Sequence, residues 1–137
     1  MMKKTHLSIG LACSLPFLTS GAVLPYSVLG ILGSIAPDWD FKLHIKHRTI
    51  THSITFLMLS TILIYKVNVD ICYIWFLNYL LHLIADSLTK KGTPFLYPFK
   101  KKYFGLKLFK TGSFTDYLFF LISIYFLYYQ ITHTITY

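Results

Sequence analysis

The sequence contains no glutamate and only five aspartates, against thirteen lysine and arginine residues in a chain of 137. Because acidic side chains are so scarce, the position of each aspartate is informative. There are also only two cysteines, Cys13 and Cys72, and both lie inside apolar runs. Their positions argue against a structural disulfide, and no CxxC pair that could bind a metal is present.

Apolar residues dominate the chain, with 55% hydrophobic and 18% aromatic side chains. This composition is too apolar for a soluble domain of this length and predicts a single integral membrane domain over residues 1–137. The net charge of +8 is carried mainly by basic clusters at residues 3–4, 42–48 and 90–110. Basic clusters beside apolar segments suit the cytoplasmic face of a bilayer with anionic lipid. Nucleic acid is a less favoured partner, because no known binding motif is present.

The apolar segments predict an all-α fold, a polytopic membrane bundle of four to five helices. We interpret residues 7–36 as two short segments joined near Ser20. At about 15 residues each they would extend roughly 22 Å, less than the roughly 30 Å hydrocarbon core, and could therefore form a re-entrant pair. A signal peptide is the alternative, since the basic start, apolar core and small residues near Ser20 fit that template. Further helices are predicted at 52–66, capped by Thr51, and at 71–89 and 115–131.

The predicted helix at 71–89 carries an ionisable pair, His82 and Asp86, near its end. Residues four apart share one helix face at a separation of about 6 Å. Burying such groups without a partner costs several kcal/mol, and ionisable residues inside membrane helices commonly mark functional sites. The pair could hold a metal ion, or the two side chains could bond each other without one.

Topology brings further polar residues to the same place. If residues 7–36 form a hairpin, all three basic clusters fall on one face of the membrane, which the positive-inside rule assigns to the cytoplasm. Five of the six histidines and four of the five aspartates fall on that face. They are His6, Asp38, Asp40, His44, His47, His52, His82, Asp86 and Asp116. This convergence predicts a functional site at the cytoplasmic face.

The residue types indicate the chemistry. Imidazole nitrogens and carboxylate oxygens bind zinc, manganese or iron, and we expect the mixed set to hold Zn2+ or Mn2+. Such an ion activates water, and a pair of ions can clamp a phosphoryl group. Arg48 offers a forked donor for phosphate, and Lys90 and Lys91 are candidate headgroup contacts. The predicted substrate is a phosphate-bearing molecule at the membrane surface, with a lipid as one form of it.

Several of these residues also have a purely structural explanation. Asp38 follows Pro37 and can be a turn residue. His47 and Arg48 can belong to a lipid-facing basic loop. Asp116 can cap the helix that it begins.

Four blocks of sequence carry a family resemblance: THLSIGLACS at 5–14, PDWD at 37–40, HRTITHS at 47–53 and YLLHLIADSLTKKGTPFLYP at 79–98. Their order and spacing resemble the YdjM-like membrane-bound metal-dependent hydrolases of bacterial inner membranes. The resemblance implies a distant likeness to the zinc-dependent phospholipase C and P1 nuclease group. It also implies a set of metal ligands, which in this chain are His6, Asp40, His52, His82 and Asp86.

The chain departs from the family pattern in three places. The HRG step of the family is His47, Arg48 and Thr49 here, and Asp116 stands where the family has a glutamate. The second HxxxE pair of the soluble phospholipases is absent, which favours one or two ions rather than three.

We therefore predict a multi-pass hydrolase of the bacterial inner membrane with its site facing the cytoplasm. Metal-activated water would attack a phosphoester, with Asp38, His47 and Arg48 as catalytic residues. One rival is a non-enzymatic membrane protein whose His/Asp cluster holds a structural ion or a hydrogen-bond network. A second rival is a metal transporter, for which ionisable residues are expected nearer the bilayer centre. The sequence does not specify an oligomeric state.

Overall fold

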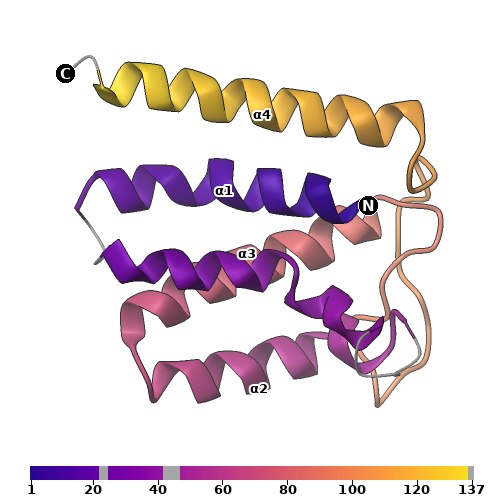
Figure 1. Ribbon diagram of the computed structural model, residues 1–137. Helices are drawn as coiled ribbons and strands as arrows, with labels where there is room; N and C mark the ends of the chain where they lie inside the picture. Colours follow the sequence, from indigo (N-terminus) through magenta and orange to yellow (C-terminus); the bar gives the residue numbers. More distant parts are fainter. Residues whose placement is uncertain (22–24, 42–46, 136–137) are drawn as a thin grey trace.

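The computed structural model describes residues 1–21, 25–41 and 47–135, so His44 lies outside the described residues. In the described ranges the chain forms four α-helices, three 3-10 helices and no β-strand (Figure 1). The helices are α1 (Lys3–Thr19), η1 (Pro25–Ser34), η2 (Ala36–Phe41), η3 (Ile50–His52), α2 (Ile54–Tyr65), α3 (Val69–Ser87) and α4 (Phe114–Ile135). The all-α prediction is therefore confirmed.

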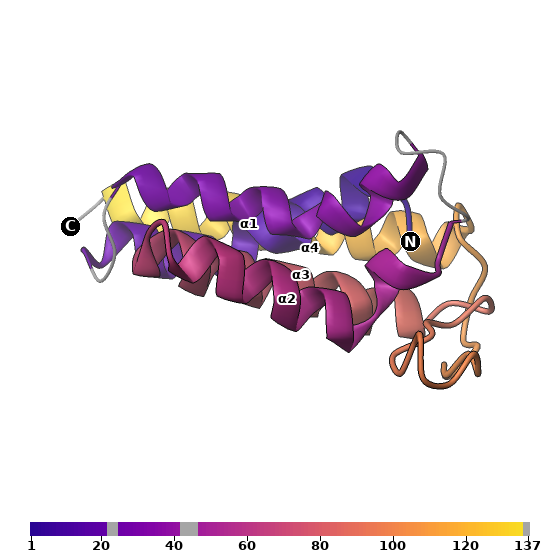
Figure 2. The same cartoon turned by 90° about the horizontal axis from the view of Figure 1, so that it is seen from below.

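The helices run side by side along one axis, as Figures 1 and 2 show. The chain reverses direction after α1, and η1 returns beside it, as predicted for residues 7–36. Then α2 and α3 form an antiparallel pair, and α4 lies outermost against α1. As a result, the start of α1, the 3-10 helices η2 and η3, the end of α3 and the start of α4 all lie at one end of the bundle.

The closest packing in the bundle joins η1 to α3. A 3-10 helix has about three residues per turn, so side chains three apart line up on one face. In η1 this places Ser27, Gly30 and Gly33 in one row, and all three are buried. A Cβ atom at Gly30 or Gly33 would come within 2.7 Å of the α3 backbone around Trp75. The two glycines thus let η1 lie directly on the backbone of α3.

Short-range contacts set the start of α2. Ser53 is its N-cap, because the Ser53 hydroxyl accepts a hydrogen bond from the Phe56 amide at 3.2 Å. The prediction that Thr51 caps this helix is wrong. The Thr51 hydroxyl donates instead to Asp40, since the η3 turn between Ile50 and His52 carries it toward that carboxylate.

Among the described residues, two helices are long and apolar enough to cross a membrane, over Val69–Ser87 and Phe114–His133. At 19 and 20 residues they extend about 28 and 30 Å. The shorter α2 has 12 residues and extends about 18 Å. Most of the large side chains of α4 are exposed, including Leu121 at 60% and Tyr125 at 70%. The prediction that four or five segments cross the membrane remains a prediction.

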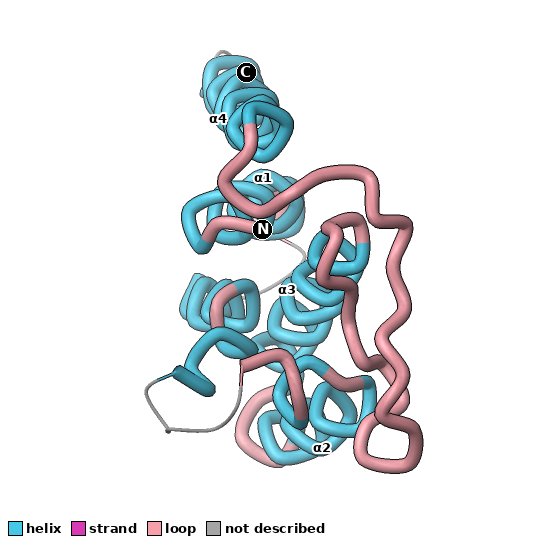
Figure 3. Tube along the Cα trace, turned by 90° about the vertical axis from the view of Figure 1, so that its right-hand side faces the viewer, coloured by secondary structure: helices cyan, strands magenta, loops and turns pink. Residues whose placement is uncertain are grey.

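The basic loop between α3 and α4 folds back across the end of α3 (Figure 3). The Lys90 amide donates to the Phe109 carbonyl at 2.8 Å, and the Leu106 amide donates to the Ser87 carbonyl at 2.9 Å. These backbone bonds hold the loop beside the end of the bundle where the predicted site residues lie.

Candidate metal centre

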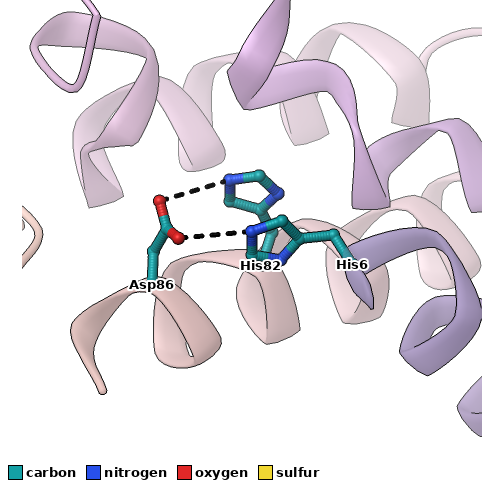
Figure 4. Close-up of side chains that lie close together, drawn as sticks. All are labelled: His6, His82 and Asp86. Carbon is teal, nitrogen blue, oxygen red and sulfur yellow. Dashed lines mark hydrogen bonds and ion pairs between the residues drawn. The ribbon is translucent and has the colours of Figure 1, made fainter. Parts of the chain in front are cut away.

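The Asp86 carboxylate lies at the centre of the cluster and is 1% exposed. Its Oδ1 atom lies 3.2 Å from His6 Nε2, and its Oδ2 atom lies 3.8 Å from His82 Nε2. The rings of His6 and His82 stack at a centroid distance of 3.7 Å. Figure 4 shows both imidazoles turned toward the carboxylate. The i,i+4 pair predicted on α3 is therefore joined by a histidine from α1.

His82 is held by a backbone contact on its far side. Its Nδ1 atom donates a hydrogen bond of 2.7 Å to the carbonyl oxygen of Ser34, at the end of η1. A carbonyl can only accept, so in neutral His82 the proton sits on Nδ1 and the lone pair on Nε2 faces the cluster. The close approach of η1 to α3 thus fixes the orientation of a candidate metal ligand.

His52 links Asp86 to the two aspartates of η2. Its Nε2 atom lies 3.4 Å from His82 Nε2, 3.5 Å from Asp86 and 3.6 Å from Asp38. Its Nδ1 atom lies 3.5 Å from Asp40 on the opposite side of the ring. Asp38 therefore faces the shared space between the imidazoles, whereas Asp40 lies behind His52.

The charge state of Asp38 follows from these neighbours. Burial alone would raise the pKa of its carboxyl, but hydrogen bonding with His52 and the nearby His82 and His6 lower that pKa to about 2. For His52, burial alone would lower the pKa, but Asp38 and Asp86 raise it above its ordinary value. Asp38 is thus a carboxylate at neutral pH and can serve as an anionic ligand.

Asp40 organises the loop that carries His47 and Arg48. It accepts hydrogen bonds from His47 Nδ1 at 3.0 Å, from the Arg48 amide at 3.1 Å and from the Thr51 hydroxyl at 3.2 Å. The His47 side chain is 43% exposed, which makes it the most accessible of the predicted site residues in the described ranges. The backbone of Arg48 has a positive φ of 60°.

Arg48 is buried and its guanidinium is largely engaged. Nη2 lies 2.8 Å from Asp86 Oδ1, and Nη1 donates to the Thr89 hydroxyl and the Gly92 carbonyl, both at 3.0 Å. The amino group of Met1 contacts the same Asp86 oxygen. Arg48 therefore joins the cluster to the start of the basic loop.

Two groups of these side chains are arranged so that each could hold a metal ion. One group, His6, His82 and Asp86, offers three ligand atoms within 4.8 Å of one another, and a second group, Asp38, His47 and His52, does the same. The 3.4 Å contact between His52 and His82 makes the two groups adjacent. Except for His47, the members of both groups are buried, and imidazole nitrogens and carboxylate oxygens are the kinds of atom that bind zinc and manganese.

All eight predicted site residues thus gather at one end of the bundle, and Asp116 stands apart from them. Asp116 accepts hydrogen bonds from the Thr5 hydroxyl at 3.0 Å and from the Gly112 amide at 2.9 Å, and so ties the start of α1 to the start of α4. Sequence reasoning did not identify Ser34 or Thr89 as supporting groups. The Ser34 contact uses a backbone carbonyl, which leaves no signature in a sequence.

A helical bundle with an apolar outer surface and a buried His/Asp cluster at one end defines the class: an α-helical membrane protein with a candidate metal centre. The chain matches the YdjM inner membrane protein family over residues 1–136 and belongs to that family. Comparison with curated proteins and with solved structures gives no match.

Proposed function

We propose that this protein is a membrane-bound metal-dependent hydrolase that cleaves a phosphoester at the cytoplasmic face of the inner membrane. The observation that carries the proposal is the convergence of three histidines and two aspartates on one buried space. These five residues are His6, Asp38, His52, His82 and Asp86, and they come from four separate segments of the chain. A chain that needs only solvated loops has no reason to bury these groups together, since burial of ionisable side chains is costly.

In this proposal the five converging side chains hold the ion or ions, and the residues behind them set their orientation. The Thr51 hydroxyl lies 3.2 Å from His52 Nδ1 and donates to Asp40, so it links His52 to that carboxylate. The Ser34 carbonyl supports His82 in the same way, as second-sphere groups commonly do in metal sites. A bound divalent ion would supply a water molecule with a pKa near neutrality. His47 is exposed and hydrogen-bonded to Asp40, so it is suited to exchange a proton with substrate or solvent.

The metal content of purified protein tests the centre. We expect one or two zinc or manganese ions per chain in the wild type and loss of metal in Asp86→Asn and His82→Gln. Two matched variants serve as controls, because Asp70 begins α3 at the opposite end and His133 lies exposed on α4. Asp70→Asn and His133→Gln should keep the metal content of the wild type, as measured by elemental analysis of folded protein in detergent.

A panel of phosphomonoesters and phosphodiesters then tests the reaction. Turnover should require the metal and fall at least about 100-fold in Asp86→Asn, since removal of even a supporting group costs about 10- to 100-fold. Full metal occupancy without turnover of any phosphoester would contradict the hydrolase proposal.

A specific contact favours the non-enzymatic alternative. Arg48 and Asp86 already form a buried ion pair at 2.8 Å, so the cluster has an internal counter-charge. If the cluster is purely structural, His82→Gln should lower the thermal unfolding temperature strongly while the wild type binds no metal and turns over no substrate.

A further inference from the structure

A pocket of about 380 Å³ opens beside the candidate metal centre. Its walls are His47 and Arg48 from the segment after η2, and Lys91 and Tyr103 from the basic loop. The loop passes across this end of the bundle in Figure 3. The pocket lies next to the cluster because two of its walls, His47 and Arg48, also contact Asp40 and Asp86.

The walls of the pocket are held in place by hydrogen bonds. The Tyr103 hydroxyl donates to the Arg48 carbonyl at 3.0 Å, and Arg48 Nη1 donates to the carbonyl of Gly92, which follows Lys91. His47 is fixed through Nδ1 by Asp40. The loop and the centre therefore form one preorganised surface rather than two independent parts.

The pocket offers donors and positive charge. Arg48 is 4% exposed, and its Nε atom is the guanidinium nitrogen that has no hydrogen-bond partner among the described residues. Lys91 adds an ammonium group. His47 binds Asp40 through Nδ1, which leaves its Nε2 atom for a bound molecule. A buried, unpaired N–H beside a lysine and a histidine suits an anion that has several acceptor oxygens.

The basic loop also has the character of a membrane-surface segment. Phe99 is 84% exposed and Leu106 and Leu108 are 68% and 65% exposed, and they alternate with lysines. Apolar and aromatic side chains mixed with lysines are typical of the headgroup region of a bilayer. We therefore expect the mouth of the pocket to lie near the headgroup region, where phosphate groups of lipids are concentrated.

We propose that this pocket binds the phosphate group of the substrate, with Lys91 as its principal charge. The assignment rests on the proposed function and gives its substrate a binding site. The two Nη atoms of Arg48 are committed to Asp86, Thr89 and Gly92, so Arg48 mainly positions Asp86 and adds its positive charge to the wall of the pocket. The phosphate can belong to a lipid headgroup or to a soluble ester.

Binding measurements on the full chain in detergent test the pocket without reliance on turnover. The probes are inorganic phosphate and a short-chain phosphatidic acid in mixed micelles, titrated calorimetrically into protein treated with EDTA. We expect Lys91→Gln to raise the Kd of the preferred probe at least about tenfold. Lys100→Gln changes an exposed lysine of the same loop outside the pocket, and should alter the Kd less than about twofold.

The two probes separate the sources of the phosphate. Tighter binding of phosphatidic acid than of inorganic phosphate assigns the pocket to a lipid headgroup, and equal binding assigns it to a soluble phosphate ester. The proposal is overturned if neither probe binds the wild type, or if Lys91→Gln binds both as the wild type does. Metal content measured on matched samples of the same protein purified without EDTA keeps the two proposals apart. Metal without phosphate binding rejects the pocket alone, and phosphate binding without metal in those samples rejects the metal centre alone.

Discussion

Asp38 and Asp40 are separated by a single residue, yet they serve opposite sides of His52. In a 3-10 helix successive residues are about 120° apart, so residues two apart point in clearly different directions. Both aspartates belong to η2, which places Asp38 toward His52 Nε2 and Asp40 toward His52 Nδ1. From this geometry we infer that Asp38 is a metal ligand and Asp40 a supporting carboxylate.

Isosteric substitution of each aspartate separates these two roles. We expect Asp38→Asn to abolish high-affinity zinc binding, because it removes an anionic ligand from the shared space. Asp40→Asn should weaken zinc binding by about 10- to 100-fold, as is typical when a group behind a ligand histidine is lost. The affinities can be measured by competition with a zinc-binding dye. The reverse order of effects would assign the ligand role to Asp40, as the family resemblance implies.

At the scale of an element, η1 connects packing to the orientation of the cluster. Gly33 lies against the Trp75 carbonyl, and the next residue, Ser34, gives its own carbonyl to His82. A change that pushes η1 away from α3 therefore also moves a partner of a candidate ligand.

Substitution of Gly33 tests this connection. The Cβ atom in Gly33→Ala would lie 2.6 Å from the Trp75 carbonyl oxygen, a contact that real Cβ atoms do not make. We expect destabilisation of about 1–3 kcal/mol, the usual range for overpacking, and weaker metal binding. Denaturant unfolding in detergent measures the first effect. Val28→Ala is the control on the same element, because Val28 is 47% exposed and should change the stability little. Equal stability of the two variants would show that η1 does not rest on α3 in this way.

The sequence predicted the helical elements and the end of the bundle at which polar residues meet. The i,i+4 spacing paired His82 with Asp86, and alternation of apolar and basic segments brought His6 and His52 to the same end. The sequence did not show that η1 would be a 3-10 helix rather than an α-helix, because an apolar run with glycines is compatible with both. The family resemblance assigned the ligand role to Asp40, and we predicted a catalytic role for Asp38, but the side of His52 that each aspartate faces depends on the local winding of η2, which a sequence pattern does not specify.

The whole molecule is polarised along its axis. The start of α1, the end of α3 and the basic loop lie at one end, where the candidate metal centre is, and the turn between α2 and α3 lies at the other (Figure 1). Val67 in that turn is 80% exposed, and Lys100 in the basic loop is also exposed. From the positive-inside rule we expect the basic end to face the cytoplasm.

Cysteine labelling in spheroplasts tests this orientation. In a background with Cys13→Ala and Cys72→Ala, we expect Val67→Cys to react with a membrane-impermeant maleimide in intact spheroplasts. Lys100→Cys should react only after the membrane has been made permeable. The opposite pattern would place the metal centre on the periplasmic side and remove cytoplasmic phosphoesters from the candidate substrates.

The ion pair between Arg48 and Asp86 has a thermodynamic consequence. One oxygen of Asp86 faces Arg48, a wall of the phosphate pocket, while the other faces His52 and His82 in the metal centre. In the proposed site, a cation bound to Asp86 would leave more of the Arg48 charge available to an anion, so the two binding equilibria would be linked through one carboxylate. Linkage is reciprocal, and the factor by which metal alters phosphate affinity would equal the factor by which phosphate alters metal affinity. We therefore expect each ligand to bind more tightly when the other is present.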